Sequence, residues 1–184
     1  MKSLNFLKYL LITIYLLIIQ CDKNFDLLEA NNVERGTCYV NIEGYINKSF
    51  HGKAVYENVP TGYGNTLFFL ELTDVTEPGV NYRYVDFQGG SKPDVGTYSL
   101  YNFENDSIKG ILLGRYNDSE VLGSFKSLGG TIEIEYSNGN KLKGWADFYA
   151  YESISIGNGQ FIRAEIKITT TFYAEEGYTG IILN

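Results

Sequence analysis

The chain has 184 residues, of which 44% are hydrophobic and 20% are charged, and its formal net charge is −7. This composition is that of an ordinary globular protein and excludes an intrinsically disordered chain. The negative charge would repel a phosphate backbone, so the sequence predicts no nucleic-acid partner. Tyrosine (16) and phenylalanine (11) are abundant, which favours strands because aromatic side chains pack well on a pleated surface.

The first segment, residues 1–20, has the features of a secretory signal peptide. Lys2 and Lys8 form a basic start, and an uncharged apolar run follows over residues 9–20. This run is far shorter than the ~20 residues that span a bilayer, whereas a basic head with a short apolar core is typical of an export signal. We therefore expect the chain to be exported.

The apolar run stops at Cys21, and polar residues follow it. This arrangement resembles a bacterial lipoprotein signal, in which the cysteine is acylated and becomes the mature N-terminus. The residue before it is Gln20, where such signals usually have Gly, Ala or Ser; looser signals occur in lipoproteins of Bacteroidota and spirochaetes. The resemblance implies a lipid anchor at Cys21 in a bacterial membrane, most naturally the outer one. A plain membrane anchor or ordinary secretion is the alternative.

The second cysteine, Cys38, has two readings that depend on Cys21. If Cys21 carries lipid, Cys38 is an unpaired thiol on the inward face of a strand, where it behaves as a small hydrophobe. If Cys21 is not lipidated, the two cysteines could form a disulfide in an oxidising compartment. Neither reading resembles a redox motif or a zinc site.

Residues 21–35 are polar without alternation and are interpreted as a tether, and residues 36–184 as a single domain. From Thr37 onward, apolar side chains return with the period of two that is typical of strands, with turn residues between the runs. Residues 67–72 are nearly all apolar and suit a strand buried on both faces. The expected strands are 38–46, 50–56, 67–72, 82–87, 95–101, 111–116, 121–125, 131–137, 142–151, 161–173 and 178–183, the shorter ones being the less regular.

The strongest local signal is a hairpin between residues 132–136 and 142–151. Asn138 and Gly139 lie between the two alternating runs, and this dipeptide supplies the positive φ angles of a tight turn. About ten short strands with Gly- and Asn-rich turns predict an all-β fold, either an antiparallel β-sandwich or a barrel. The period of two is common to both.

Three segments carry a further resemblance: residues 96–100 (GTYSL), 130–134 (GTIEI) and 142–148 (LKGWADF), with residues 157–161 (GNGQF) before the last long strand. This pattern is similar to that of small Bacteroidota lipoproteins of unknown function with a β-sandwich domain. It covers the C-terminal half of the chain better than the N-terminal half. The resemblance implies a fold and an envelope location, and it carries no site residues.

The most informative functional feature is aromatic. In the run 142–151, small and apolar residues at even positions predict an inward face. The other face carries Trp145, Asp147, Tyr149 and Tyr151. Aromatic rings beside a carboxylate on an open sheet would bind a glycan, since rings stack on sugar C–H groups and Asp accepts from hydroxyls. The alternatives are that a second sheet covers these rings, that they pair across strands, or that they bind a protein.

No motif predicts an enzyme. His51 is the only histidine, no Gly-x-Ser-x-Gly sequence places a nucleophile, and a zinc site would need mostly carboxylate ligands. Glu133 and Glu135 share a strand face, but alternating Glu is typical of a solvated face. We therefore expect no cofactor or metal and a non-catalytic envelope module that binds a glycan or protein. The alternatives are a structural lipoprotein docking a membrane partner and a hydrolase with an unrecognised carboxylate pair.

Overall fold

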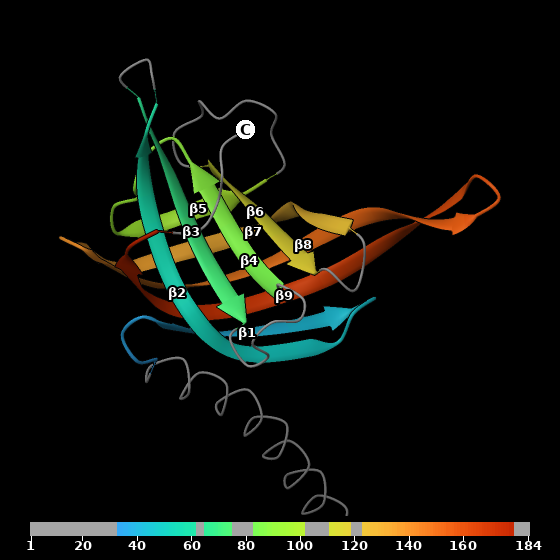
Figure 1. Cartoon of the computed structure of the whole chain (residues 1–184), viewed down its shortest axis with the longest axis horizontal. Coiled ribbons are helices and arrows are strands. Elements are labelled where there is room, and N and C mark those ends of the chain that lie inside the picture. The colour runs from blue at the N-terminus through green and yellow to red at the C-terminus, as the bar shows by residue number, and fades with distance from the viewer. Residues whose placement is uncertain (1–32, 62–64, 75–82, 102–110, 119–122, 179–184) are drawn as a thin grey trace, which may run out of the picture. The chain divides into compact units, whose positions relative to one another are not determined.

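The computed structural model (Figure 1) describes residues 33–61, 65–74, 83–101, 111–118 and 123–178. The chain divides into two units, 1–32 and 33–184, and the described residues all belong to the second. The expected export signal, Cys21 and most of the tether therefore lie outside the described residues. Within the described ranges, no helix has the length and apolar composition needed to span a bilayer.

The described residues form nine strands and no helix, which confirms the all-β prediction. In chain order they are β1 (Thr37–Gly44), β2 (Lys48–Pro60), β3 (Thr66–Asp74), β4 (Arg83–Gly89), β5 (Gly96–Leu100), β6 (Ile111–Asp118), β7 (Gly123–Asn138), β8 (Lys141–Gly157) and β9 (Gln160–Glu176).

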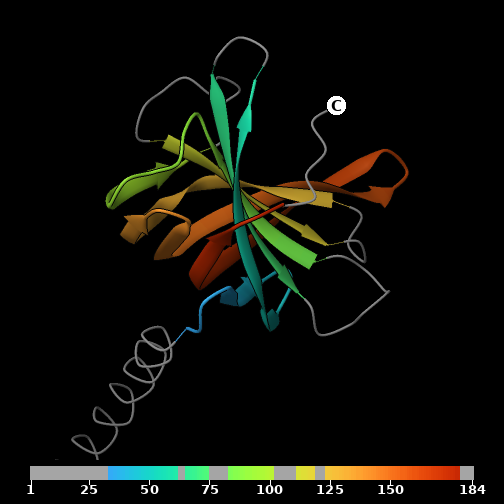
Figure 2. The same ribbon diagram turned by 60° about the vertical axis from the view of Figure 1, so that its left-hand side comes forward.

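All nine strands belong to one sheet that closes into a barrel, where the sequence left sandwich and barrel open. The order around the barrel is β1-β2-β3-β4-β6-β5-β7-β8-β9, and β9 pairs antiparallel with β1 to close it. Neighbours in this order are antiparallel except β5 and β6, which make a short parallel pairing. Two additional pairings join β2 to β9 in parallel and β6 to β7 antiparallel. Figure 2 shows β7, β8 and β9 running side by side across one part of the wall.

The core lies inside the barrel and is built by the alternation read from the sequence. The inward residues of β8 are all buried, as expected: Leu142, Gly144, Ala146, Phe148 and Ala150. Cys38 also points inward and is fully buried as a free thiol. Burial raises the pKa of Cys38 to about 12, so the thiol is protonated at neutral pH and is no nucleophile.

One buried polar group is satisfied near the β7–β8 turn. The hydroxyl of fully buried Tyr56 donates to the carbonyl of Gly139 (3.0 Å) and accepts from the ammonium of Lys92 (3.0 Å). Lys92 also donates to the Gly139 carbonyl (2.8 Å) and lies 4.7 Å from the centre of the Tyr56 ring. These contacts tie the segment before β5 to the β7–β8 hairpin.

Two expected strands are parts of one. Residues 121–125 and 131–137 were expected as separate strands, but residues 123–138 form one continuous strand, β7. A register shift between Ser127 and Gly129 lets the segment between the two runs stay paired with β8. Of the expected closing strand 178–183, only Tyr178 is described, and it is exposed and not in a strand. On β3, Phe68 and Leu70 face the core while Phe69, which faces outward, is also buried, so burial on both faces is confirmed there.

The β7–β8 hairpin is where the sequence placed it, but its turn is one residue later. Asn138 pairs with Lys141, so the two loop residues are Gly139 and Asn140. Gly139 has a φ of 54°, whereas the backbone of Asn140 is not in the positive region. Positive φ at the first loop position alone is the requirement of a type II′ turn, which needs glycine there.

Strict alternation over residues 131–137 predicts that Tyr136 shares the inward face of Ile132 and Ile134, and this prediction is wrong. A register shift lies between Ile134 and Tyr136, and Tyr136 pairs with the outward-facing Lys143. The extra residue in such a bulge reverses the alternation beyond it. The Tyr136 ring is therefore exposed on the outer face.

Candidate functional site

The residues Trp145, Asp147, Tyr149 and Tyr151 lie on the outer face of β8. The even-numbered residues 144–150 between and beside them are buried in the core, so the pleat directs these four side chains outward. Tyr149 is 54% exposed, and the other three are partly exposed. Because the described strands form a single closed sheet, no second sheet among them covers this face.

The strand register brings two more rings to the same face. Trp145 pairs with Thr171 of β9, and Thr171 pairs in turn with Tyr39 of β1, so the three side chains form one row across three strands. Tyr39 is 40% exposed. Tyr173, two residues after Thr171, lies beside this row and is partly exposed. We call Tyr39, Trp145, Tyr149 and Tyr173 the aromatic face.

Polar groups lie between these rings. Asp147 pairs with Thr169 across β9 and forms an ion pair with Lys167 (3.1 Å). The hydrogen bond with Asp147 raises the pKa of Lys167, which stays charged at neutral pH. Thr169 in turn pairs with Asn41 of β1. The aromatic face therefore offers carboxylate, ammonium, hydroxyl and amide groups as hydrogen-bond partners.

Tyr151 differs from the other rings of β8. The guanidinium of Arg163 lies 4.8 Å from the centre of its ring, and Arg163 also pairs with Glu165 (2.7 Å). The Tyr151 ring is thus already engaged by a cation. Of the four residues predicted as a ligand site, the structure leaves Trp145 and Tyr149 with ring surface to offer and Asp147 paired with Lys167.

Sequence reasoning missed Tyr39 and Tyr173 as members of this face. Both alternate with buried residues on their strands, so the period of two places them outward. Alternation does not reveal that β1 pairs with β9, and this pairing places Tyr39 in the same row as Trp145. That pairing joins the first and last described strands, so no local pattern encodes it.

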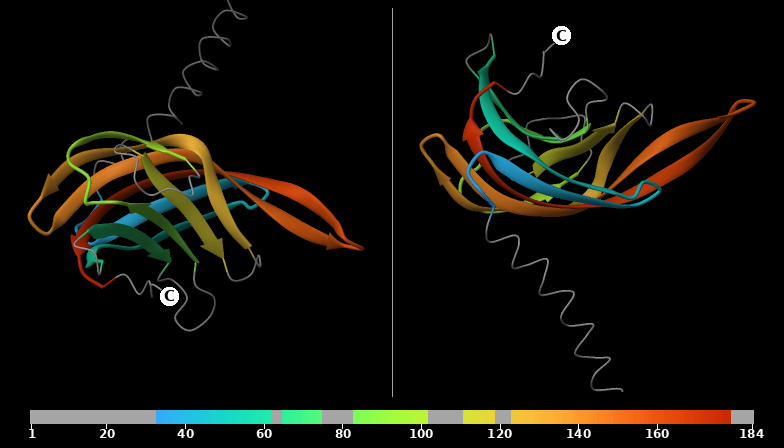
Figure 3. Two further views of the ribbon diagram at one scale, coloured as in Figure 1. Left: turned by 90° about the horizontal axis from the view of Figure 1, so that it is seen from above. Right: turned by 60° about the horizontal axis from the view of Figure 1, so that its bottom comes forward.

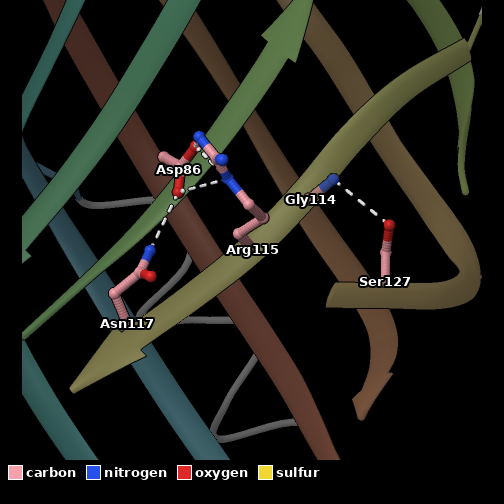
Figure 4. Close-up of polar contacts among 5 residues, drawn as sticks. All are labelled: Asp86, Gly114, Arg115, Asn117 and Ser127. Carbon is pink, nitrogen blue, oxygen red and sulfur yellow. Dashed lines mark hydrogen bonds and ion pairs between the residues drawn. The ribbon is translucent and has the colours of Figure 1, made fainter. Parts of the chain in front are cut away.

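A second polar cluster lies on the outer face of β4 and β6, and Figure 4 shows it. Arg115 donates to the carboxylate of Asp86 from Nε (3.0 Å to Oδ2) and Nη2 (2.7 Å to Oδ2), and Asn117 donates to Oδ1 (3.2 Å). Asp86 is fully buried although it faces outward, and the Arg115 side chain is 28% exposed. The same figure shows the backbone amide of Gly114 donating to buried Ser127 (3.2 Å).

Burial raises the pKa of Asp86, while the charge and hydrogen bonds of Arg115 and the hydrogen bond of Asn117 oppose this effect. Glu71 of β3 pairs directly with Asp86 of β4. Burial raises the pKa of Glu71 too, and the Asp86 charge adds to this increase. These two acids are a carboxylate pair that the sequence did not reveal. Because the Asp86 carboxylate has no exposed surface and accepts from two side chains, it is built to hold strands together rather than to meet a substrate.

The remaining sequence candidates do not assemble into a site. His51 is exposed on β2, Glu133 is partly exposed opposite Trp145, and exposed Glu135 lies 3.5 Å from Lys143. In the described part of the chain, no three His, Cys, Asp or Glu side chains come together in a way that could hold a metal ion.

Comparison of the chain with protein-family models, with curated proteins and with solved structures finds no match. The resemblance to small Bacteroidota lipoproteins therefore stays a prediction.

Proposed function

We propose that this protein is a non-catalytic binding module of the bacterial cell envelope, anchored by lipid at Cys21, that holds an extended neutral glycan on its aromatic face. The observation that carries the proposal is the row of Trp145, Thr171 and Tyr39 across three strands, with Tyr149 exposed beside it. Ring faces attract the polarised C–H groups of a sugar, and a tyrosine hydroxyl can exchange hydrogen bonds with sugar hydroxyls.

The distribution of polar groups favours a glycan over a protein. The centre of a protein interface is depleted in charged residues. On the aromatic face, by contrast, Asp147 and Lys167 lie among the rings, and Thr169 and Thr171 line β9 between them. A sugar has a hydroxyl on nearly every carbon and can use each of these groups.

The spacing of the rings favours a chain of sugars over a single one. Trp145 and Tyr149 are four residues apart on β8, which is about 13 Å along a strand. Tyr39 lies two strands from Trp145, about 10 Å across the sheet. The formal charge of −7 disfavours an acidic polysaccharide, so we propose a neutral one.

The test is native electrophoresis of the protein in gels that contain a neutral soluble polysaccharide: xylan, glucomannan, mixed-linkage β-glucan or hydroxyethylcellulose. We expect at least one to retard the wild-type protein, and Tyr149→Ala and Tyr39→Ala to reduce the retardation severalfold. Tyr178→Ala is the matched control, because Tyr178 is an exposed tyrosine beyond the end of β9. Equal retardation of all three variants would exclude the aromatic face as the binding surface.

The anchor has its own test, because it is independent of the ligand. Radiolabelled palmitate should be incorporated into the wild-type protein in a bacterial host, and Cys21→Ala should abolish both the label and the membrane association. Soluble wild-type protein without label would disprove the anchor and leave the glycan proposal intact. Co-purification of a stoichiometric membrane protein that survives Tyr149→Ala would favour a structural role instead.

A further inference from the structure

The outer end of the β8–β9 hairpin forms an arm that leaves the barrel wall, as Figures 1 and 3 show. The last pair of β8 with β7 is at Tyr151, and the last pair of β9 with β1 is at Ile166. Beyond these points β8 and β9 still pair with each other, to Gly157 and Gln160. We call residues 153–162 the arm.

The arm carries no charge, although the chain as a whole is acidic. Its ten residues are Ser, Ile, Gly, Asn, Gln and Phe, and charged residues resume at Glu152 and Arg163 on either side. At the base of the arm, the Arg163 guanidinium forms an ion pair with Glu165 and lies over the Tyr151 ring.

Apolar side chains project from both faces of the arm. Phe161, opposite Ser155, points to the outer face and is 66% exposed. Ile162 is its neighbour on the strand and so points the other way, where it is partly exposed and pairs with Ile154, which packs against the core. Ile156, at the register shift before the turn, is 56% exposed.

We propose that the tip of the arm contacts an uncharged lipid surface. A protein partner packed on one face of a two-stranded ribbon would leave the apolar groups of the other face in water. Lipid surrounds the tip and takes up Phe161, Ile156 and the exposed part of Ile162 together, whereas Ile154 packs against the core. The absence of charge over residues 153–162 fits this partner, since ionised side chains resist transfer from water and the acidic chain gains nothing from anionic headgroups.

The backbone of the arm limits how deeply it enters. Along residues 153–162 β8 and β9 pair only with each other among the described strands, so half of the backbone groups point away from the ribbon at its two edges. Such groups need water, and a bare strand edge is not tolerated in the hydrocarbon core. The arm therefore stays at the level of the headgroups, with only its apolar side chains reaching inward.

The contact of the arm with lipid has a low affinity by itself, and an anchor that holds the protein at the membrane would raise its occupancy. Two or three apolar side chains bind a membrane only marginally, but an anchor elsewhere in the chain would make the contact intramolecular. The readout must therefore report on the arm itself. Trp145 is the only tryptophan, so Trp145→Phe with Phe161→Trp, and separately with Ile156→Trp, places a single reporter on the tip.

Each single-tryptophan protein is studied as the full chain with phosphatidylcholine vesicles that contain brominated acyl chains, which quench tryptophan on contact. We expect both tip reporters to shift to shorter emission wavelength and to be quenched at least twofold. The matched control is the wild-type protein, whose Trp145 on the barrel wall should keep its emission. Adding Ile156→Asp to the Phe161→Trp protein should abolish the effect.

Two results would overturn the proposal. The first is quenching of the tip reporters no greater than that of Trp145. The second is a blue shift that appears without vesicles and grows with protein concentration, which would assign the arm to a second copy of this chain. Neither result bears on the glycan proposal.

Discussion

The barrel has two kinds of outer wall. On β3 and β4 the outward side chains Phe69 and Asp86 are buried, and Asp86 accepts hydrogen bonds from the partly exposed Arg115 and Asn117 of β6. On β8, β9 and β1 the outward side chains are rings and polar groups that remain exposed in part. Both walls come from the same alternation of residues. Their difference shows that facing outward in a closed sheet does not mean facing water, and that the open wall is the one available to a ligand.

This contrast has an energetic form. Removing one partner of a buried ion pair is costly because the other charge is left without compensation. An exposed cross-strand ring pair contributes only ~0.2–1 kcal/mol. Substitutions on β3, β4 and β6, the covered wall, should therefore lower the free energy of unfolding. Substitutions on β8, β9 and β1, the open wall, should lower the affinity for a ligand.

The largest expected effect is that of Arg115→Ala. This change leaves the buried Asp86 carboxylate with Asn117 as its described side-chain partner and should lower the free energy of unfolding at pH 7 by about 3–5 kcal/mol. Urea unfolding followed by circular dichroism measures it. The control is Asp86→Asn, which leaves the partly exposed Arg115 in contact with water and should cost less. A loss below 1 kcal/mol for Arg115→Ala would remove the distinction between the walls.

The second change compares one aromatic ring from each wall. Phe69→Ala should cost about 3 kcal/mol, because a buried ring is removed and the cavity is only partly filled by relaxation. Urea unfolding of Phe69→Ala beside Tyr149→Ala gives both values under one condition. Similar losses for the two variants would mean that the aromatic face is as covered as the β3 wall.

The third prediction concerns pH. The pKa of Asp86 is raised, so the folded state binds this proton more tightly than the unfolded state, and the contribution to stability is full below the ordinary carboxyl pKa. It is lost as pH rises through the raised pKa, by about 1.4 kcal/mol for each unit by which the pKa is raised. Unfolding between pH 3 and pH 7 should show this slope in the wild-type protein and a smaller one in Asp86→Asn. Equal slopes would contradict the raised pKa.

The smallest stability effect is expected for Tyr149→Ala, about 0.5 kcal/mol, because the ring is half exposed and its loss leaves no cavity. The same variant should lose polysaccharide binding severalfold. A variant that binds normally but unfolds easily would reverse the roles of the two walls.

The sequence predicted the open wall better than the covered one. On β8, small and apolar residues at even positions placed Trp145 and Tyr149 outward, because alternation is a local property of a strand. The same rule failed at Tyr136, since a register shift depends on the partner strand as well as on the residues themselves. It also separated residues 121–125 from 131–137, which the pairing with β8 joins.

The covered wall could not be predicted. Asp86 alternates with Val85 and Phe87 and so resembles any solvated acid on the polar face of a strand. Its burial depends on Arg115 and Asn117, which come from β6. Strand β6 pairs with β4, and β5, which lies between them in the sequence, is on the far side of β6. Register between distant strands is a property of the closed barrel and leaves no mark on the local pattern.

The most direct test of the account is acrylamide quenching of Trp145 in the folded protein, alone and with each of three neutral hexasaccharides: xylohexaose, cellohexaose and mannohexaose. We expect acrylamide to quench Trp145 in the free protein, but less than in the urea-unfolded chain. At least one saturating hexasaccharide should reduce this quenching in the wild-type protein but not in Tyr149→Ala. A Trp145 that resists quenching in the free protein would place the ring in the core. A Trp145 whose quenching none of the three sugars alters would contradict the proposed glycan site.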